Sequence, residues 1–276
     1  MGTLRNKIIL GVIIVFALIF MSPLIWMFVT SLRPTSELYR YPITLIPREL
    51  SLENYSYVFG EMRSFLRYFL NSLIVTVSTV LLVLISSAMS GYAFGKREFR
   101  GREVLFMGII LVLTIPYIMY LIPIYMMEDW LGLQNNWLGL ILPYVALNLP
   151  WGILIMRGAF ATIPNDIKDA AIVDGCTELQ LWFRVMLPMT KPSLAATGII
   201  TFVFAWQEYL FASTLMTKNQ WQTLPVGIVW IRDELQTLVY GRIGAMIVLS
   251  IIPVLIIFLI FKDFFIEGLR EGMLKG

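Results

Sequence analysis

The chain has 276 residues, of which 58% are hydrophobic and only 14% charged, and its mean hydropathy of +0.79 excludes an ordinary water-soluble domain. The absence of histidine and the presence of a single cysteine exclude histidine-based catalysis, histidine metal sites and internal disulfides, so we expect no catalytic residue and no metal site. The formal net charge of +3 is small and reflects the loops, so it carries no argument about nucleic acid. From the apolar composition we expect membrane lipid to surround the chain, and we expect no nucleic acid partner.

Six apolar runs follow one another along the chain, and each is long enough to cross about 30 Å of hydrocarbon, which takes roughly 20 helical residues. Backbone groups in lipid must be satisfied within the chain, and the alternating pattern of a transmembrane barrel is absent. We therefore predict an all-α, polytopic membrane protein with six transmembrane helices in a single domain over residues 1–276. The first run is too long for the apolar part of a signal peptide, so we expect it to be retained. The runs are Ile8 to Thr30, Leu66 to Phe94, Val104 to Met127, Trp137 to Phe160, Ser193 to Leu215 and Ile243 to Phe265.

Positive charges in the short loops predict the orientation of these helices. Basic residues crowd the loop between the second and third runs, whereas the next loop carries Glu128 and Asp129 and no base, so the former is expected in the cytoplasm. Both termini are then cytoplasmic in a multi-pass protein of the cell membrane. Arginines in the first outer loop argue for the opposite orientation, but glutamates offset them. The basic loop holds Lys96, Arg97, Arg100 and Arg102, and the first outer loop holds Arg33, Arg40, Arg48, Arg63 and Arg67.

A polar insert over residues 162–192 separates the fourth and fifth runs and is cytoplasmic by parity. Pro164 suits the first turn of a helix, and Gly175 is able to take the left-handed conformation that ends one. Thr177 followed by Gln180 is a capping box that starts a second helix, which Pro188 is expected to stop. We predict two short helices joined by a tight glycine turn.

Small and apolar side chains give this insert a surface suited to docking. Ala170 and Ala171 allow close approach by a partner. The second helix has an apolar face at helical spacing, which suits a knob that enters a groove. The alternative is an amphipathic helix pair on the inner leaflet, but the near-zero net charge of the insert disfavours a membrane surface. The apolar face consists of Leu181, Trp182, Val185 and Met186.

Polar residues inside the apolar runs mark a candidate solute pathway. Glu208, beside Gln207, falls in the outer half of the fifth run, where an ionisable group must face protein or water; alternatively, the run ends early and Glu208 lies in the headgroup layer. Asn148 before Pro150, Thr114 before Pro116, and Pro123 predict kinked or broken helices in the third and fourth runs that present backbone groups to a cavity, or else ordinary packing irregularity. Three tyrosines suit either stacking on a sugar ring or anchoring at the lipid interface, namely Tyr117, Tyr120 and Tyr125.

The chain offers no phosphate-binding loop. The nearest approach runs from Gly91 to Lys96, but it has one residue too few between its glycines. Arg97 then follows the lysine where a phosphate-binding loop needs serine or threonine. We therefore expect no nucleotide and no other cofactor to bind this chain.

An ordered series of short motifs runs along the chain. The central one is Asp169-Ala-Ala followed by Asp174-Gly175, with Leu187-Pro188 downstream. The others are Glu53-Asn54-Tyr55, Asn71-Ser72, Leu131 to Trp137, Trp206 to Tyr209, and Gly272 to Gly276. This series resembles the permease subunits of binding-protein-dependent ABC importers, in particular the maltose-type, carbohydrate-uptake branch. Two residues depart from that family's pattern, because Asp169 stands where glutamate is usual and Gln207 where many relatives have asparagine.

The resemblance implies a type I ABC importer permease fold and a non-catalytic role in carbohydrate uptake. It implies a second, homologous permease subunit, two ATP-binding subunits that hold ATP and Mg²⁺, and an extracytoplasmic solute-binding protein. Residues 162–192 would be the coupling helix on an ATP-binding subunit, residues 216–242 the outer loop toward the binding protein, and residues 266–276 a cytoplasmic tail. The implied contacts with the ATP-binding subunits are Asp169, Ala170, Ala171, Asp174, Gly175, Leu187 and Pro188 in the insert, and Gly272, Lys275 and Gly276 in the tail.

Two other functions stay open on sequence grounds. An ion-coupled secondary transporter usually shows inverted repeats and buried ionisable relays, and here only Glu208 suggests one. A membrane-embedded enzyme is disfavoured, because the runs contain no histidine and no paired carboxylates. The sequence does not identify the solute.

Overall fold

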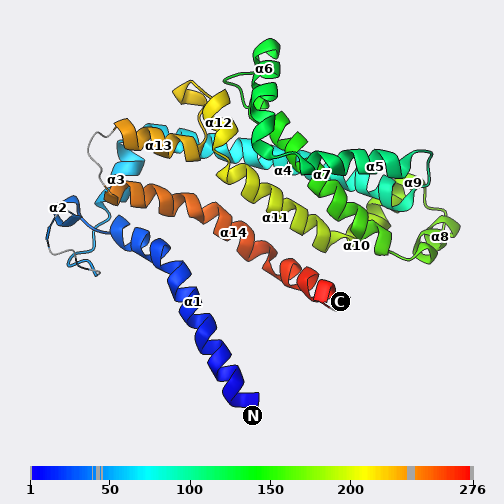
Figure 1. Ribbon diagram of the computed structural model, residues 1–276, viewed down its shortest axis with the longest axis horizontal. Coiled ribbons are helices and arrows are strands. Elements are labelled where there is room, and N and C mark those ends of the chain that lie inside the picture. Colours follow the sequence, from blue (N-terminus) through cyan, green and yellow to red (C-terminus); the bar gives the residue numbers. More distant parts are fainter. Residues whose placement is uncertain (1, 39, 42–43, 45, 235–239, 274–276) are drawn as a thin grey trace. The chain divides into compact units, whose positions relative to one another are not determined.

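The computed structural model describes residues 2–38, 40–41, 44, 46–234 and 240–273 of the chain. Every regular element in these ranges is helical and none is a strand, which confirms the prediction of an all-α protein (Figure 1). The chain divides into two compact units, Met1–Arg67 with Gly227–Pro253 and Tyr68–Val226 with Val254–Gly276, and each is described by itself. In chain order the elements are α1 (Gly2–Ser31), α2 (Thr35–Leu38), α3 (Glu53–Gly60), α4 (Arg63–Lys96), α5 (Arg102–Leu111), η1 (Val112–Thr114), η2 (Tyr117–Tyr120), α6 (Leu121–Leu131), α7 (Leu138–Thr162), α8 (Asn165–Val173), α9 (Glu178–Gln180), η3 (Leu181–Met186), α10 (Leu187–Met189), α11 (Lys191–Gln207), α12 (Leu210–Leu215), η4 (Asn219–Trp221), α13 (Leu224–Glu234) and α14 (Tyr240–Met273).

Long apolar helices account for most of the predicted spans. Within the described parts of the chain, four helices are long and apolar enough to cross a membrane, and they match the first, second, fourth and sixth runs. A fifth crossing results if the helices on either side of a 99° bend, Arg102–Thr114 and Tyr117–Leu131, form one broken span. These helices support a membrane-embedded protein, and the number of six spans stays a prediction. The four helices are Asn6–Ser31, Arg63–Lys96, Leu138–Thr162 and Tyr240–Phe264.

The third predicted run is not a continuous helix from Val104 to Met127; it is broken, as one of the two interpretations of Thr114 before Pro116 predicts. The backbone leaves the helical conformation at Ile115 and Pro116, whose ψ angles are 125° and 129°. Proline disfavours helical backbone at the residue before it and has no N–H with which to continue the hydrogen-bond ladder. Figure 1 shows α6 turned steeply away from α5 beyond this break.

The fifth predicted run is interrupted as well, so a continuous helix from Ser193 to Leu215 is also wrong. α11 ends after 17 residues, because Glu208 takes an extended conformation with a ψ angle of 127°. The chain then starts α12, and the backbone N–H groups of Phe211 and Ala212 donate to the Glu208 carboxylate at 2.8 and 3.0 Å. A carboxylate that satisfies free N–H groups at a helix start stabilises this restart.

Glycines bring the helices of the second unit close together. A Cβ built on Gly91 of α4 would lie 2.5 Å from the Cβ of Met156 in α7, and one built on Gly152 of α7 would lie 2.8 Å from the Cβ of Ser87. Small residues at such crossings allow the close backbone approach by which membrane helices associate. α7 also packs along α11 (Figure 1). Half of the membrane-spanning window of α7 is buried, which makes α7 the most enclosed of the candidate spans.

The first unit ties together α1, α3 and the first turn of α14. The Nδ2 atom of Asn54 donates to the carbonyl groups of Ser31 and Arg33 at 3.0 and 2.8 Å. The Tyr55 hydroxyl lies 2.8 Å from Oγ of Ser31. Gly241 of α14 lies against the Asn54 amide and leaves no room there for a Cβ atom. The asparagine of this early motif therefore has a structural role within its unit.

Candidate functional site

The insert begins with α8, which ends in the predicted glycine turn. Gly175 has a φ angle of +83°, in the left-handed region. Its N–H donates to the Ile172 carbonyl at 3.0 Å, and the N–H of Cys176 donates to the Ala171 carbonyl, also at 3.0 Å. This pair of hydrogen bonds is a Schellman motif, which satisfies the last carbonyl groups of the helix. The first predicted helix and its turn are therefore both present.

The second helix of the insert starts as predicted but does not end as predicted. The Thr177 hydroxyl accepts from the Gln180 N–H, and the Gln180 side chain accepts from the Thr177 N–H at 2.9 Å, which completes the capping box. The prediction that Pro188 stops the helix is wrong, because helical structure continues through α10. The segment η3 is π-helical, and its wider turn leaves room ahead of Pro188, where an α-helical ladder would clash with the proline ring.

The apolar face of the second helix packs inward, contrary to the expectation that it meets a partner. Leu181 and Met186 are fully buried and join Ala171 in a core shared with α4 and α7. Trp182 and Val185 are partly buried against the same core. The insert exposes a different apolar set, which we call the outer apolar set: Ile172 (49% exposed), Val173 (86%), Leu179 (73%) and Phe183 (63%).

The residues that the resemblance assigns to the ATP-binding subunits are divided by burial. In the central motif Ala171 is buried, and downstream Leu187 is half-buried. The exposed part of the insert therefore includes the motif carboxylates of Asp169 and Asp174 as well as the outer apolar set. Its exposed motif residues are Asp169, Ala170, Asp174, Gly175 and Pro188. In the tail, Gly272 lies in α14, whereas Lys275 and Gly276 lie outside the described residues.

Polar contacts hold the insert to the end of α4. The Tyr92 hydroxyl donates to Oε1 of Glu178 at 2.8 Å, and Arg97 forms an ion pair with the same carboxylate. Lys96 donates to Oδ1 of Asn165 at 3.1 Å. Glu178 starts the second helix of the insert and Asn165 starts the first, so the end of α4 is bonded to both halves. Two of the basic residues that predicted a cytoplasmic loop thus have a structural partner in the insert.

Glu208 lies buried at the break between α11 and α12, where its carboxylate accepts four hydrogen bonds. Two come from the backbone N–H groups of Phe211 and Ala212, and the hydroxyls of Tyr117 and Tyr144 donate the other two. The helix ends early, which agrees with the interpretation that placed Glu208 at the end of the run. Its carboxylate nevertheless pairs with protein groups, which agrees with the interpretation that it faces protein. One carboxylate therefore joins the break in the fifth run to the break in the third run and to α7.

A pocket of about 290 Å³ lies at the break between α5 and α6, and residues of α7 and α11 form its other side. Three of the predicted pathway residues, Asn148, Tyr117 and Tyr120, line it together. Gln207 and Glu208 are not among its lining residues, although Glu208 bonds to the Tyr117 hydroxyl. The structure thus brings Asn148 together with Tyr117 and Tyr120, about thirty positions away in the sequence. Glu208 lies outside the pocket and holds the Tyr117 side chain in place through a hydrogen bond.

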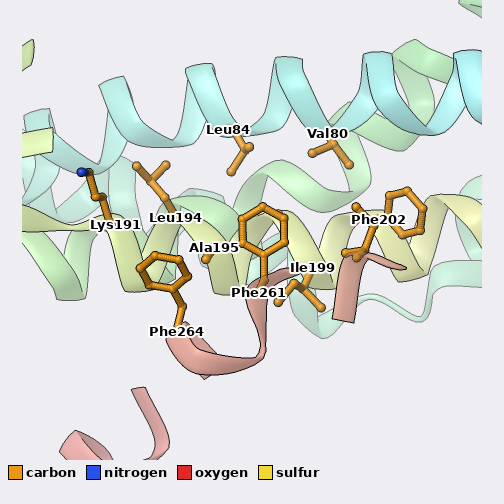
Figure 2. Close-up of a pocket in the computed structure, with 11 residues that line it drawn as sticks. Val80, Leu84, Lys191, Leu194, Ala195, Ile199, Phe202, Phe261 and Phe264 are labelled. Carbon is orange, nitrogen blue, oxygen red and sulfur yellow. The ribbon is translucent and has the colours of Figure 1, made fainter. Parts of the chain in front are cut away.

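A second, apolar groove of about 360 Å³ lies between α4, α11 and the last part of α14. Figure 2 shows Val80 and Leu84 of α4 pointing into the space that Phe261 of α14 enters from the other side. Lys191, at one end in this view, is the only charged residue among the described ones that line it. A polar solute would find almost no hydrogen-bonding partner here, so the candidate pathway is the pocket at the broken span.

Two features of the site are not recognised in the sequence analysis. Trp151 lines the pocket with its indole 51% exposed, and its position three residues after Asn148, on the same helical face, is the available signal. Arg157 of α7 donates to both carboxylate oxygens of Glu103 at 2.8 Å and lies 3.8 Å from the ring centre of Phe106. An arginine within an apolar run is a signal for such an ion pair.

Comparison with known families gives a match over most of this chain. A family model described as "Binding-protein-dependent transport system inner membrane component" matches residues 87–271. An arabinooligosaccharides transport system permease of Halalkalibacterium halodurans is 34% identical over 262 residues, covering 94% of this chain and 93% of the relative. A sulfoquinovosyl glycerol transport system permease of Agrobacterium fabrum is 36% identical over 254 residues, covering 92% and 88%.

Among solved structures, the chain is similar to a subunit in the crystal structure of a bacterial ABC transporter involved in the import of the acidic polysaccharide alginate. The TM-score is 0.80 at 26% sequence identity, and the match covers 95% of each chain.

Proposed function

The chain belongs to the family of inner membrane components of binding-protein-dependent transport systems, and from this premise we propose that it is one of two permease subunits that form the pathway of an ATP-driven carbohydrate importer. The observation that carries the sugar class is the likeness, over more than nine-tenths of this chain, to permeases named for arabinooligosaccharides, sulfoquinovosyl glycerol and diacetylchitobiose. The chain itself is a transport subunit without catalytic activity.

The ATP-binding subunits would act on this chain through the insert. The first helix of the insert ends at the Gly175 turn, and the inward face of the insert is part of a core with α4 and α7. The insert is therefore a folded element packed on these helices and not a free loop. The outer apolar set and the carboxylates of Asp169 and Asp174 remain accessible to a companion subunit. We assign the docking contact to this exposed surface and not to the buried Leu181 and Met186.

Hydrolysis is assigned to two ATP-binding companion subunits, which would hold ATP and Mg²⁺. The segment from Gly91 to Lys96, the nearest approach to a phosphate-binding loop, is helical within α4. Most of its N–H groups are therefore engaged in the helix and are not available to surround a phosphate. This chain would contribute part of the solute pathway and the insert that contacts an ATP-binding subunit.

The proposed orientation of the chain in the membrane follows from the position of the insert. If the insert meets an ATP-binding subunit, it lies in the cytoplasm with both termini, and residues 216–242 lie outside. That outer segment contains η4 and α13 and would face the solute-binding protein. Its first residues are fastened to α4, because the Leu224 N–H donates to Oγ of Ser72 at 2.7 Å.

The test is uptake by proteoliposomes that contain this chain with its sister permease, the ATP-binding subunits and the solute-binding protein. We expect a labelled oligosaccharide to accumulate only when ATP and the binding protein are both supplied. Accumulation by the purified chain alone, driven by a proton or sodium gradient, would instead identify an ion-coupled carrier and overturn the proposal.

A further inference from the structure

We propose that the pocket at the break between α5 and α6 binds one uncharged saccharide ring during import, an inference that rests on the proposed function. Its volume of about 290 Å³ is at the lower end of small-molecule sites, which suits a single ring. It is built where the third run is broken, and irregular backbone at membrane depth is tolerated only where it is buried in protein or lines a polar cavity. Such a cavity is the expected place for a solute.

The broken backbone forms one wall of this pocket. Leu113 and Pro116 both line the pocket, and Pro116 has no N–H with which to continue the helical hydrogen-bond ladder. A break of this kind leaves helix-end carbonyl groups that need donors, and a sugar hydroxyl is such a donor.

Three polar side chains of the pocket each donate a hydrogen bond to a backbone carbonyl of the protein. Nδ2 of Asn148 donates to the Tyr144 carbonyl at 2.8 Å, the Tyr120 hydroxyl donates to the Val112 carbonyl at 2.8 Å, and the Thr114 hydroxyl donates to the Leu111 carbonyl at 2.7 Å. Their oxygen atoms keep lone pairs that accept hydrogen bonds. The pocket therefore presents these acceptor oxygens together with the second N–H of the Asn148 amide, and saccharide hydroxyl groups can pair with both because they donate and accept.

Aromatic side chains form part of the apolar wall, beside Val112, Ile115 and Leu147. Tyr117 is fixed edge-on against Phe204, with ring centroids 5.9 Å apart, and both line the pocket. Trp151 adds a half-exposed indole that has an apolar face and one free donor at its edge. A sugar ring has apolar C–H faces and polar edges, so aromatic faces combined with acceptors suit it better than they suit an ion.

Charge selects against acidic sugars at this site. None of the described residues that line the pocket is charged. The nearest carboxylate along the bonded groups is that of Glu208, which holds the Tyr117 hydroxyl. A uronate entering the pocket would find no cation and would lie near another acidic group, which is unfavourable in a site of low dielectric constant.

The experiment is saturation-transfer NMR on the complete importer in nanodiscs, without the binding protein, using arabinotriose, diacetylchitobiose and an alginate trisaccharide as probes. We expect transfer to at least one neutral sugar and about tenfold less to the alginate trisaccharide, equivalent to one decade in affinity. Trp151→Leu and Asn148→Leu should each reduce transfer to the neutral sugar about tenfold, and Trp151→Phe should retain most of it. Trp130→Leu is the matched control, because that indole is 84% exposed and lies outside the pocket.

Three results would overturn the inference: equal transfer to the alginate trisaccharide, unchanged transfer in both leucine variants, or no transfer to any of the three probes. Thermal unfolding of each complex identifies a variant that has lost its fold, and Trp151→Phe then decides the role of the aromatic face. The proposed function is tested separately by ATP-dependent uptake with the binding protein present, so it can stand when the pocket inference fails.

Discussion

The Tyr92 hydroxyl donates a hydrogen bond to Oε1 of Glu178 at 2.8 Å, which joins α4 to the start of the second helix of the insert. The Tyr92 ring also packs edge-on against Phe160 of α7, with ring centroids 5.5 Å apart. One side chain of α4 thus contacts both the insert and α7. A displacement of the insert by an ATP-binding subunit would reach the bundle through packed side chains, which is the kind of contiguous contact that carries mechanical coupling.

Replacing Tyr92 by phenylalanine should weaken this coupling without removing the ring contact. The loss of one hydrogen bond corresponds to about 0.5–1.5 kcal/mol. We expect less sugar imported per ATP hydrolysed by the reconstituted importer, with basal hydrolysis retained. Tyr209→Phe is the control, because the Tyr209 side chain is exposed. Equal transport ratios for the two variants would remove the Tyr92 contact from the coupling path.

The turn at Gly175 should tolerate asparagine and reject valine. Its φ angle of +83° is strained for residues with a Cβ by about 1–2 kcal/mol, less for asparagine, although the space around a built Cβ is open. We expect Gly175→Val to uncouple hydrolysis from uptake and Gly175→Asn to keep most transport, measured as binding-protein-stimulated ATPase activity. Gly158→Ala is the control, because Gly158 is helical and also faces open space. Wild-type coupling in Gly175→Val would show that the turn does not matter.

Signals that act between near neighbours are the part of the site that the sequence predicts well. The Gly175 turn and the Thr177 capping box each depend on residues within a few positions, and both are present. The first helix starts at Asn165, one residue after the proline that the sequence places in its first turn. The break at Glu208 depends instead on Tyr117 and Tyr144, which are 91 and 64 positions away. Hydrophobic periodicity gives the length of the fifth apolar run, but it does not reveal the distant tyrosines that stabilise a break in its helix.

The inner face of the insert shows a second limit of sequence reasoning. Helical spacing correctly groups Leu181, Val185 and Met186 on an apolar face, yet it does not say what covers that face. The structure covers it with α4 and α7 of the same chain. Pro188 was expected to end the helix because a proline in an α-helix clashes with the preceding turn, and the π-helical segment before it removes that clash.

Replacing Glu208 by glutamine should destabilise the folded subunit. An amide has one acceptor oxygen for the four donors that now converge on the carboxylate, and a buried donor left without a partner costs about 1–3 kcal/mol. We expect a lower melting temperature of the detergent-solubilised complex by fluorescence-detected size exclusion. Asp129→Asn is the control, because the Asp129 carboxylate is exposed. Melting temperatures that shift equally in both variants would contradict this role for Glu208.

Acid should loosen the segment between α2 and α3 through Glu37. The Arg48 N–H, at 3.0 Å, is the main cause that lowers the pKa of the Glu37 carboxyl below its ordinary value of 4.5, and the Glu49 N–H and Arg33 also lower it against the effect of burial. Because the folded pKa is below the unfolded one, the stabilisation is present above pH 4.5 and is lost as the pH falls through the folded value.

Hydrogen exchange of residues 46–53, corrected for intrinsic rates, measures this acid effect. We expect protection to fall as the pH decreases below 4.5 in the natural chain. Glu37→Gln should weaken protection at neutral pH and abolish most of the acid-dependent change. Glu61→Gln serves as the control, since its side chain is exposed at the end of α3. An unaltered acid transition in Glu37→Gln would assign the effect to another group.

Asn71 should control how firmly the outer loop is presented to the solute-binding protein. Its Nδ2 donates to the carbonyl groups of Gln220 and Gln222 at 3.0 and 2.9 Å, and its Oδ1 accepts from Nε1 of Trp137 at 3.2 Å. Asn71→Leu removes both bonds to the loop, a loss of about 1–3 kcal/mol. If residues 216–224 form part of the docking surface, the binding protein should bind the importer in nanodiscs about tenfold more weakly, as measured by biolayer interferometry. Gln220→Ala is the matched control, because it keeps the carbonyl that Asn71 contacts. Unchanged affinity in Asn71→Leu would mean that this clamp serves the fold alone.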